Sequence, residues 1–308
     1  MLEIFQKTIN NPISIEGVGL HSGNKSKITI LPGNIDQGIV FRRIDLKENN
    51  LVEANYESVS SAKLCTTLEN KNGVKVSTVE HLLAAIYIAE IDNAIVEIDN
   101  EEIPIMDGSA KNFLDLFKVT EIKTQTKKRK YLKILNTVEL LDGERKISIE
   151  PHDSSLEVDF QLNYNNSIIG QQRNLVNFQN DKLEDVCNSR TFCLYEDIEK
   201  IKKAGLAKGG SLENAIVVKD DQVVNKGGLR NEKEFVNHKI LDLVGDFLLS
   251  GYRILGKVKC YQGGHELTNM FLRKLLSSKS DIISNEIIEN SISKKINTNQ
   301  SIKLAVNA

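Results

Sequence analysis

The sequence predicts an α+β protein of two similar domains, each a mixed β-sheet packed with helices. The chain has 308 residues, a length that fits two domains of ordinary size. Residues 79–98, "VEHLLAAIYIAEIDNAIVEI", and residues 236–258, "VNHKILDLVGDFLLSGYRILGKV", also share an order: a histidine near a helix start, an apolar helix and then a strand. Each segment follows several short strands, so we expect two α+β halves that pack face to face.

The first half begins with strands and then changes to helical periodicity. Residues 1–70 alternate apolar and polar side chains between Gly, Pro and Asn turns, which predicts short strands. Residues 77–90 then carry one apolar helical stripe, formed by Val79, Leu82, Leu83 and Ile86. Ser77 or Thr78 is the predicted N-cap of this helix, with Glu80 in its first turn. A strand, "NAIVEID", and a turn followed by a helix, "EEIPIMDGSAKNFLDLF", complete this half.

A polar segment separates the halves. It reads "EIKTQTKKRKYLKI" and has a basic run at 127–130, which favours a solvated linker over a nucleic-acid patch. We therefore place a first domain at 1–125 and a second at 126–280. Residues 281–308 have no clear periodicity and are interpreted as a C-terminal tail.

The second half repeats the strand-then-helix pattern. Several strands lead to a mixed region at 187–230, and the apolar pattern of residues 237–251, "NHKILDLVGDFLLSG", then predicts a buried helix. A strand, a glycine turn and a last helix follow in "ILGKVKCYQGGHELTNMFLRKLL".

Composition excludes several classes of protein. The chain is 40% hydrophobic and 27% charged, with a net charge of −2, as in an ordinary soluble globular protein. A nucleic-acid binder would need a basic surface, so no nucleic-acid partner is expected. No stretch approaches the roughly 18 apolar residues of a membrane span, and no signal peptide is visible. The four cysteines form no CxxC pair, so we expect reduced thiols and a cytoplasmic protein.

The second predicted buried helix carries three ionisable groups along one face. His238, Asp242 and Asp246 are each four residues apart, and positions i and i+4 of a helix lie on the same side. A buried carboxylate needs a partner. A metal ion is one solution, because imidazole and carboxylate are ligands of catalytic zinc. A salt bridge to Arg253 or Lys239 is the other solution, and the spacing alone leaves both open.

Two further histidines extend this group. His81 follows Glu80 at the start of the first helix, so Glu80 would lie beside a metal bound by His81. The arrangement differs from HExxH, because Ala85 occupies the place of the second histidine. His265 follows two glycines and could act as an acid, with Asp246 setting its tautomer. Three ligands with an open fourth position are typical of a catalytic zinc site.

With these residues in place, the chain resembles the zinc-dependent UDP-3-O-acyl-N-acetylglucosamine deacetylases, which catalyse the committed step of lipid A biosynthesis. The matching segments, in chain order, are "GVGLHSG", "STVEHLLAA", "IPIMDGSA", "SRTFC", "GGSLENAIVV", "GLRNEKEFVNHKILDLVGD" and "GGHELTN". They run from residue 17 to about residue 269 and cover most of the chain.

The resemblance implies an active site at the interface of the two domains. The implied zinc ligands are His81, His238 and Asp242. Glu80 matches the general base, His265 the general acid held by Asp246, and Thr191 the residue that helps to hold the substrate carbonyl and its oxyanion. The implied substrate-binding positions are Phe192, Ile198, Gly210 and Lys239, with Lys239 near the diphosphate. Cys65 matches a cysteine near the metal without a catalytic role.

An insert in the second domain, residues 193–224, is implied to form an apolar passage for the acyl chain. Ile198 and Ile201 share a helical face, which periodicity alone explains equally well as ordinary packing. Gly209 and Gly210 would let the backbone turn at the mouth of the passage. Cys193 followed by Leu194 departs from the family pattern, which often has a bulkier, more flexible or aromatic choice in this loop.

The resemblance also implies the cofactor and the partners. Zn²⁺ is the expected metal, and Fe²⁺ fits a His₂Asp site in the cell because selectivity among such metals depends on availability. The expected partner is an acylated UDP-sugar, and the protein is expected to be a monomer. Two other hypotheses stay open: an amidase or esterase of the same fold with another substrate, and a non-enzymatic protein whose ionisable stripe is salt-bridged in the core.

Overall fold

The computed structural model describes residues 3–277 and the backbone of 282–283. Strand β20 (Ile282–Ile283) pairs antiparallel with β11 (Tyr131–Ile134). The rest of the predicted tail at 281–308 lies outside the described residues.

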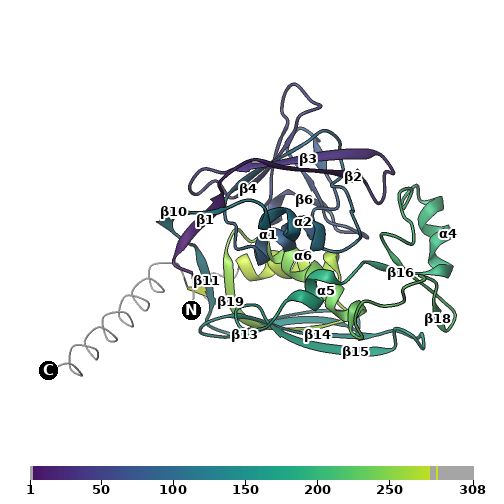
Figure 1. The fold of residues 1–308 in the computed structure, drawn as a ribbon. Coiled ribbons are helices and arrows are strands. Elements are labelled where there is room, and N and C mark those ends of the chain that lie inside the picture. Colours follow the sequence, from purple (N-terminus) through teal and green to yellow (C-terminus); the bar gives the residue numbers. More distant parts are fainter. Residues whose placement is uncertain (1–2, 278–281, 284–308) are drawn as a thin grey trace.

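The elements form layers, with helices between two large sheets (Figure 1). In the described part of the chain, the first sheet has five strands in the order β2 (Ile13–Val18), β3 (Lys25–Pro32), β9 (Ala94–Ile98), β4 (Ile39–Arg43) and β5 (Leu51–Glu53). The helices between this sheet and the second sheet that come from the same half of the chain are α1 (Glu80–Ile88) and α2 (Lys111–Lys118).

The second large sheet comes from the second half of the chain. Besides β11 and β20, its described strands are β12 (Val138–Asp142), β13 (Arg145–Pro151), β14 (Leu156–Asn163), β15 (Gln171–Asn177) and β19 (Arg253–Tyr261). The helices α3 (Glu184–Asn188), α5 (Glu234–Leu248) and α6 (His265–Ser277) belong to this half. The mixed α+β class predicted from the sequence is confirmed.

The strand that follows the main helix is central in each large sheet. Strand β9 follows α1 and lies between β3, to which it is antiparallel, and β4, to which it is parallel. Strand β19 follows α5 and pairs antiparallel with β13 and parallel with β11 and β14. The repeated helix–strand order seen in the sequence is therefore a repeated arrangement in space.

Smaller elements complete the described structure. They are the paired strands β1 (Phe5–Ile9) and β10 (Ile122–Lys128), the sheet of β6 (Val59–Ser61), β7 (Thr67–Glu69) and β8 (Lys75–Val76), the sheet of β16 (Phe192–Leu194), β17 (Ile216–Lys219) and β18 (Gln222–Val223), the helix α4 (Tyr195–Lys203) and the short 3₁₀ helix at Tyr56–Ser58. The sheet of β16–β18 and helix α4 correspond to the predicted insert and project to one side (Figure 1).

The linker prediction for residues 121–134 is wrong. Most of its polar part is strand β10, which pairs antiparallel with β1 at the start of the chain. Its side chains are mostly exposed, as predicted, because β1 and β10 form a two-stranded ribbon without a further strand beside it. Arg129 directly follows the strand and is buried against Asp92. Polar composition therefore indicated solvent exposure here but not the absence of structure.

Two helix boundaries also differ from the predictions. Helix α1 begins at Glu80 without a side-chain cap, because the Thr78 hydroxyl donates instead to Glu102 Oε1 at 2.8 Å and Thr78 has a φ of +55°. Helix α5 runs three residues earlier than predicted at both ends. It begins at Glu234, whose carboxylate pairs with Arg190, and the chain turns away at Gly251, which has a φ of +75°.

Helices α1 and α5 cross closely at the centre of the molecule. Both are buried almost all round, so the single stripe predicted for α1 underestimated its burial. At the crossing, a Cβ atom on Gly245 would lie 2.2 Å from the Glu80 carbonyl oxygen. Only glycine allows the two helices to approach so closely. This close approach places the start of α1 beside the ionisable face of α5.

Substitution Gly245→Ala is therefore expected to destabilise the protein. The added methyl would overlap backbone atoms of α1, which cannot rotate away, and overpacking of this kind typically costs about 1–3 kcal/mol. Urea unfolding would measure the difference. Gly264→Ala is the matched control, because a Cβ there meets no atom within 4 Å. Equal unfolding free energies for both variants would contradict the close-crossing argument.

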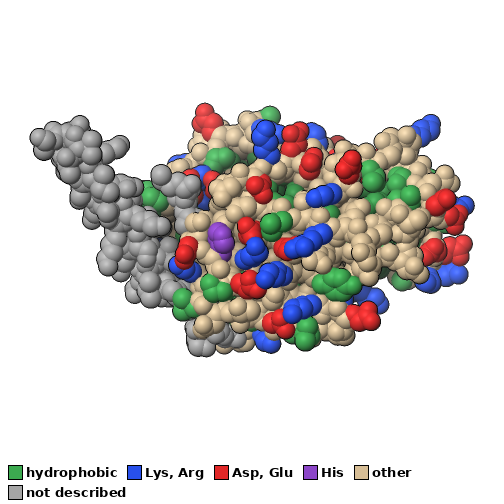
Figure 2. Space-filling view, turned by 90° about the horizontal axis from the view of Figure 1, so that it is seen from below, with side chains coloured by type: hydrophobic (Ala, Val, Ile, Leu, Met, Phe, Trp, Pro, Cys, Tyr) green, Lys and Arg blue, Asp and Glu red, His purple; other side chains and the backbone are tan. Residues whose placement is uncertain are grey.

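The outer face of the second sheet is charged and solvated. Figure 2 shows Lys and Arg side chains interspersed with Asp and Glu. Cross-strand ion pairs such as Lys257–Glu157 and Lys259–Glu150, both at 2.6 Å, account for part of this pattern. Among the described residues, no helix is long and apolar enough to cross a membrane.

Candidate metal and acid–base site

Three side chains converge where α1 meets α5. His81 Nε2 lies 3.6 Å and His238 Nε2 3.3 Å from the same oxygen, Asp242 Oδ1. The three ligand atoms lie within 4.8 Å of one another, and all three residues are buried. Helix α5 places His238 and Asp242 one turn apart on one face, while α1 supplies His81 from the other half of the chain.

The donors fit a bound divalent metal ion. Asp242 Oδ1, the oxygen that both imidazoles face, is buried in the described structure without a hydrogen-bond partner, which is costly unless another group satisfies it. The separations of 3.6 and 3.3 Å between Asp242 Oδ1 and the two imidazole nitrogens match the roughly 3.3–3.6 Å expected between neighbouring ligand atoms of a tetrahedral ion with bonds of about 2.0–2.2 Å. His238 Nδ1 lies 3.1 Å from the Ser189 carbonyl oxygen, an arrangement that orients the ring with Nε2 toward Asp242.

Of the two salt bridges that were the alternative to a metal, the structure contains only one. Arg253 does not reach this face: its guanidinium donates to the Tyr87 and Ile91 carbonyl oxygens at the far end of α1. Lys239 Nζ does donate to Asp242 Oδ2, at 2.9 Å. This contact uses the second carboxylate oxygen and leaves Oδ1 facing the two imidazoles, so the lysine does not replace a metal.

An acid–base group lies beside the three ligands. His265, the first residue of α6, places Nδ1 2.8 Å from Asp246 Oδ2 and Nε2 3.6 Å from Glu80 Oε1. The same Nε2 is 3.8 Å from Asp242 Oδ2. The structure therefore brings together all of the sequence-predicted metal and acid–base residues, from three helices of both halves.

Burial and the neighbouring charges set the pKa values of this group. Burial raises the pKa of Glu80, although His265 and His81 oppose the change. Burial alone would lower the pKa of His265, but Asp246, Glu80 and Asp242 more than offset it and raise the pKa to about 10. Burial lowers the pKa of His238 to about 3 against the pull of Asp242, so its ring is neutral. A neutral imidazole is the form that binds a metal, and a protonated His265 is the form that can donate a proton.

An apolar cavity of about 270 Å³ opens beside this group. Thr191, Phe192, Ile198 and Gly210 are among its lining residues. The Phe192 ring lies 6.3 Å from the His238 ring, and Lys239 Nζ lies 5.5 Å from the Phe192 ring centroid. Of the substrate-binding positions predicted from the sequence, Phe192, Ile198 and Gly210 therefore line one cavity, and Phe192 connects that cavity to His238 and Lys239.

The cavity wall joins both halves of the chain. The Thr191 backbone N–H donates to the Gly108 carbonyl oxygen at 2.8 Å, so the "MDG" turn of the first half holds Thr191 in place. Gly209 lies in a turn, as predicted, because the Gly210 backbone N–H donates to the Ala207 carbonyl oxygen at 3.2 Å. A Cβ on Gly209 would also lie 2.2 Å from the Gly19 carbonyl oxygen, so this glycine allows a close approach between two loops.

His21 also lines the cavity, although its sequence pattern predicted no role for it. The residue is 9% exposed, and within the described structure neither ring nitrogen has a hydrogen-bond partner. Its backbone N–H donates to Glu102 Oε1 at 2.8 Å. The glycines on both sides of "GLHSG" were the available signal that this histidine lies in a tightly folded loop.

The cysteines take no part in the ligand set. Within the described residues all four are free, as predicted. Burial raises the pKa of Cys65 to about 12, with Glu80 contributing, so its thiol is neutral at physiological pH.

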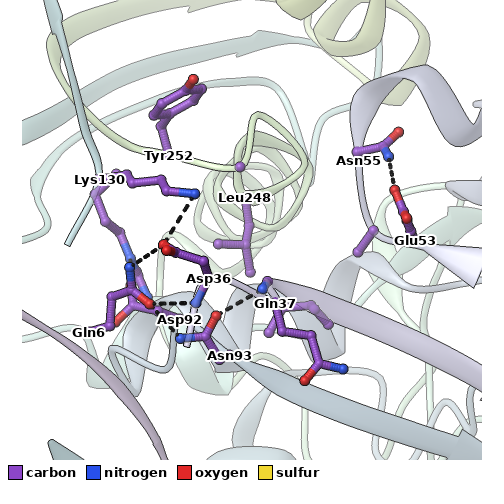
Figure 3. Close-up of a pocket in the computed structure, with 15 residues that line it drawn as sticks. Gln6, Asp36, Gln37, Glu53, Asn55, Asp92, Asn93, Lys130, Leu248 and Tyr252 are labelled. Atoms are coloured by element: carbon purple, nitrogen blue, oxygen red, sulfur yellow. Dashed lines mark hydrogen bonds and ion pairs between the residues drawn. The ribbon is translucent and has the colours of Figure 1, made fainter. Parts of the chain in front are cut away.

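A second cavity, of about 230 Å³, lies at the opposite end of α5 (Figure 3). Its polar groups bind one another: Gln6 Nε2 donates to Asp36 Oδ1 at 2.8 Å, Asn93 Nδ2 donates to Gln6 Oε1 at 2.8 Å, and Lys130 Nζ pairs with Asp36 at 3.3 Å. This cavity is separate from the candidate site, and of these three contacts only the Lys130–Asp36 pair joins the two halves of the chain.

Hydrolysis of an amide or ester needs an activated water molecule, an acid that protonates the leaving amine or alcohol, and space for the acyl part of the substrate. Helices α1, α5 and α6 bring these requirements to one place in a two-sheet α+β fold. The fold and the site thus define a metal-dependent hydrolase.

Comparison with known proteins identifies the family. The family model for UDP-3-O-acyl N-acetylglycosamine deacetylase matches residues 6–277, and the chain belongs to this family. It is 40% identical over 280 residues to the UDP-3-O-acyl-N-acetylglucosamine deacetylase of Pseudoalteromonas translucida, covering 90% of this chain and 92% of the relative. The proteins of the same name from Geotalea uraniireducens and Shewanella sediminis are 42% and 40% identical, covering 89% and 97% of this chain and 89% and 99% of the relatives.

Proposed function

We propose that this protein removes the N-acetyl group of UDP-3-O-acyl-N-acetylglucosamine, releasing acetate and UDP-3-O-acyl-glucosamine in lipid A biosynthesis. The observation that carries the proposal is the meeting of the metal ligands and the Glu80–His265 pair with an apolar cavity. Membership of the family supports the choice of substrate.

His81, His238 and Asp242 would hold the metal, which we propose is Zn²⁺. Fe²⁺ suits the same donors, because selectivity among such metals depends on availability. When bound, the ion supplies Lewis acidity, which lowers the pKa of a water molecule and polarises a carbonyl.

Two residues beside the metal ligands, Glu80 and His265, carry out the two proton transfers of the reaction. Glu80 Oε1 accepts the proton of the attacking water, and its raised pKa makes it a stronger base than an exposed carboxylate. His265 Nε2 then donates a proton to the nitrogen of the leaving amine, which is too basic to leave as an anion. Asp246 holds the His265 ring through Nδ1. The Thr191 hydroxyl helps to hold the substrate carbonyl and its oxyanion, which typically contributes about 3–4 kcal/mol per donor.

The remaining predicted residues bind the substrate. Ile198 and Gly210 border the cavity that we propose receives the 3-O-acyl chain. Phe192 lines this cavity and lies next to His238, and Lys239 Nζ lies over the Phe192 ring. The lysine charge would pair with the diphosphate of the substrate.

The remaining predictions belong to the same proposal. They are a cytoplasmic, monomeric enzyme, a first domain at 1–125 and a second domain at 126–280 with the passage insert. Free cysteines are consistent with the cytoplasm.

Acetate release from acylated and non-acylated UDP-GlcNAc tests the substrate. The acylated substrate is expected to have a kcat/KM at least about 100-fold higher, because each buried CH₂ contributes ~0.8 kcal/mol and a few such groups give that factor. The two substrates share the sugar, the amide and the diphosphate, so only the acyl chain differs. Equal values would favour an amidase or esterase with another substrate and would overturn the passage assignment.

A further inference from the structure

Thr66 contacts both carboxylates that flank His265. It is buried and directly precedes strand β7 in the first half of the chain. Its hydroxyl donates to Asp246 Oδ1 at 2.7 Å, and its backbone N–H donates to Glu80 Oε2 at 3.0 Å. One residue thus holds a carboxylate on α1 and a carboxylate on α5.

These contacts determine which oxygens face the imidazole. With Oδ1 bound to Thr66, Asp246 presents Oδ2 to His265 Nδ1 at 2.8 Å. With Oε2 bound to the same threonine, Glu80 presents Oε1 to His265 Nε2 at 3.6 Å. Thr66, Glu80, His265 and Asp246 therefore form a closed ring of polar contacts.

We propose that Thr66 is a positioning residue for proton transfer, which fixes Asp246 through its side chain and Glu80 through its backbone. The inference rests on the proposed function and adds a residue to it. Without the hydroxyl, a buried Asp246 oxygen loses its donor, and the carboxylate is free to rotate away from His265. The backbone contact to Glu80 survives any side-chain change, so substitutions test the Asp246 arm alone.

Thr66→Val tests the hydroxyl, since valine keeps the shape of threonine. We expect kcat to fall about 10–100-fold, the usual range for a residue that orients a functional group, with KM and metal content unchanged. Thr66→Ser restores the hydroxyl and should return kcat to within about threefold of the starting protein. Thr67→Val is the matched control, because its hydroxyl contacts Cys65 Sγ, at 3.9 Å, and not the carboxylates that flank His265. Should T66V fail to fold, T66A removes the hydroxyl with a smaller side chain.

A double-mutant cycle separates positioning from ordinary packing. In an Asp246→Ala background, Thr66→Val should cause no further loss of kcat, because the group that it positions is already gone. An equal loss in both backgrounds, or an undiminished kcat for T66V, would overturn the inference.

A spectroscopic measurement keeps the inference independent of the reaction. The Nδ1–H proton of His265, bonded to Asp246, should give a low-field proton NMR signal that is absent in His265→Ala. Thr66→Val should shift or broaden this signal, whereas Thr66→Ser should leave it in place. If the unmodified protein releases no acetate, the proposed function fails, and the signal still decides the role of Thr66. An unshifted signal in T66V would overturn that role.

Discussion

Treatment with a metal chelator is expected to reduce acetate release to the uncatalysed background, and about one equivalent of Zn²⁺ should restore it. The three ligands are buried, and Asp242 Oδ1 has no hydrogen-bond partner in the described structure, so the site is built for an ion. Without the ion, Glu80 has no acidified water from which to take a proton. Acetate release, measured with metal content on the same samples, checks this expectation.

Thermal unfolding provides a second readout for the metal. An ion that binds only the folded state raises Tm, so Zn²⁺ should raise the Tm of the metal-free protein. His238→Ala removes one ligand and should abolish this increase together with activity. If one equivalent of Zn²⁺ binds but no acetate is released, the metal site stands and the substrate assignment is refuted. Full acetate release by metal-free protein would support the substrate and refute the role of the metal.

His265→Ala is expected to lower kcat by about 10²–10⁴-fold while one equivalent of metal stays bound. His265 lies beside the ligands, and its Nδ1 bonds to Asp246 while its Nε2 faces Glu80. Nε2 is therefore the atom that would donate a proton to the leaving amine. Because the side chain acts in the transition state, kcat should fall more than KM changes. Steady-state kinetics and metal analysis of the purified variant would measure both quantities.

His152→Ala is the matched control for this variant. His152 lies in a turn after β13, where its Nδ1 contacts the hydroxyl of Ser155, and it is remote from the candidate site in the fold. Its removal should leave kcat and metal content unchanged. Retained turnover in His265→Ala would contradict the role of general acid, and loss of metal in that variant would instead place His265 among the ligands.

The sequence predicted the functional face of α5 well because helix geometry is local. Four-residue spacing puts His238, Asp242 and Asp246 on one side wherever the helix lies, and the structure brings the first two together with His81. Whether a metal or a salt bridge satisfies these carboxylates could not be predicted from residues close in sequence. It depended on Arg253, which the fold turns toward the end of α1, and on Lys239, which binds only one oxygen of Asp242.

The wrong predictions have a common physical cause. Strand β10 was interpreted as a linker because its side chains are polar, but its backbone bonds to β1, more than 100 residues earlier in the chain. Thr78 was interpreted as a helix cap, but its hydroxyl is taken by Glu102. In both cases a distant partner competed for the same hydrogen-bonding group and won.

The sequence by itself determined the α+β class, the repeated helix–strand unit and the ionisable residues that share a helix face, because each depends on periodicity over a few turns. Only the tertiary structure decided how α1 and α5 cross at Gly245, and hence how Glu80 comes to face His265. It also decided that Thr66 meets Asp246, 180 residues away. Such contacts depend on the packing of whole elements, and the spacing of residues along a single helix or strand does not determine that packing.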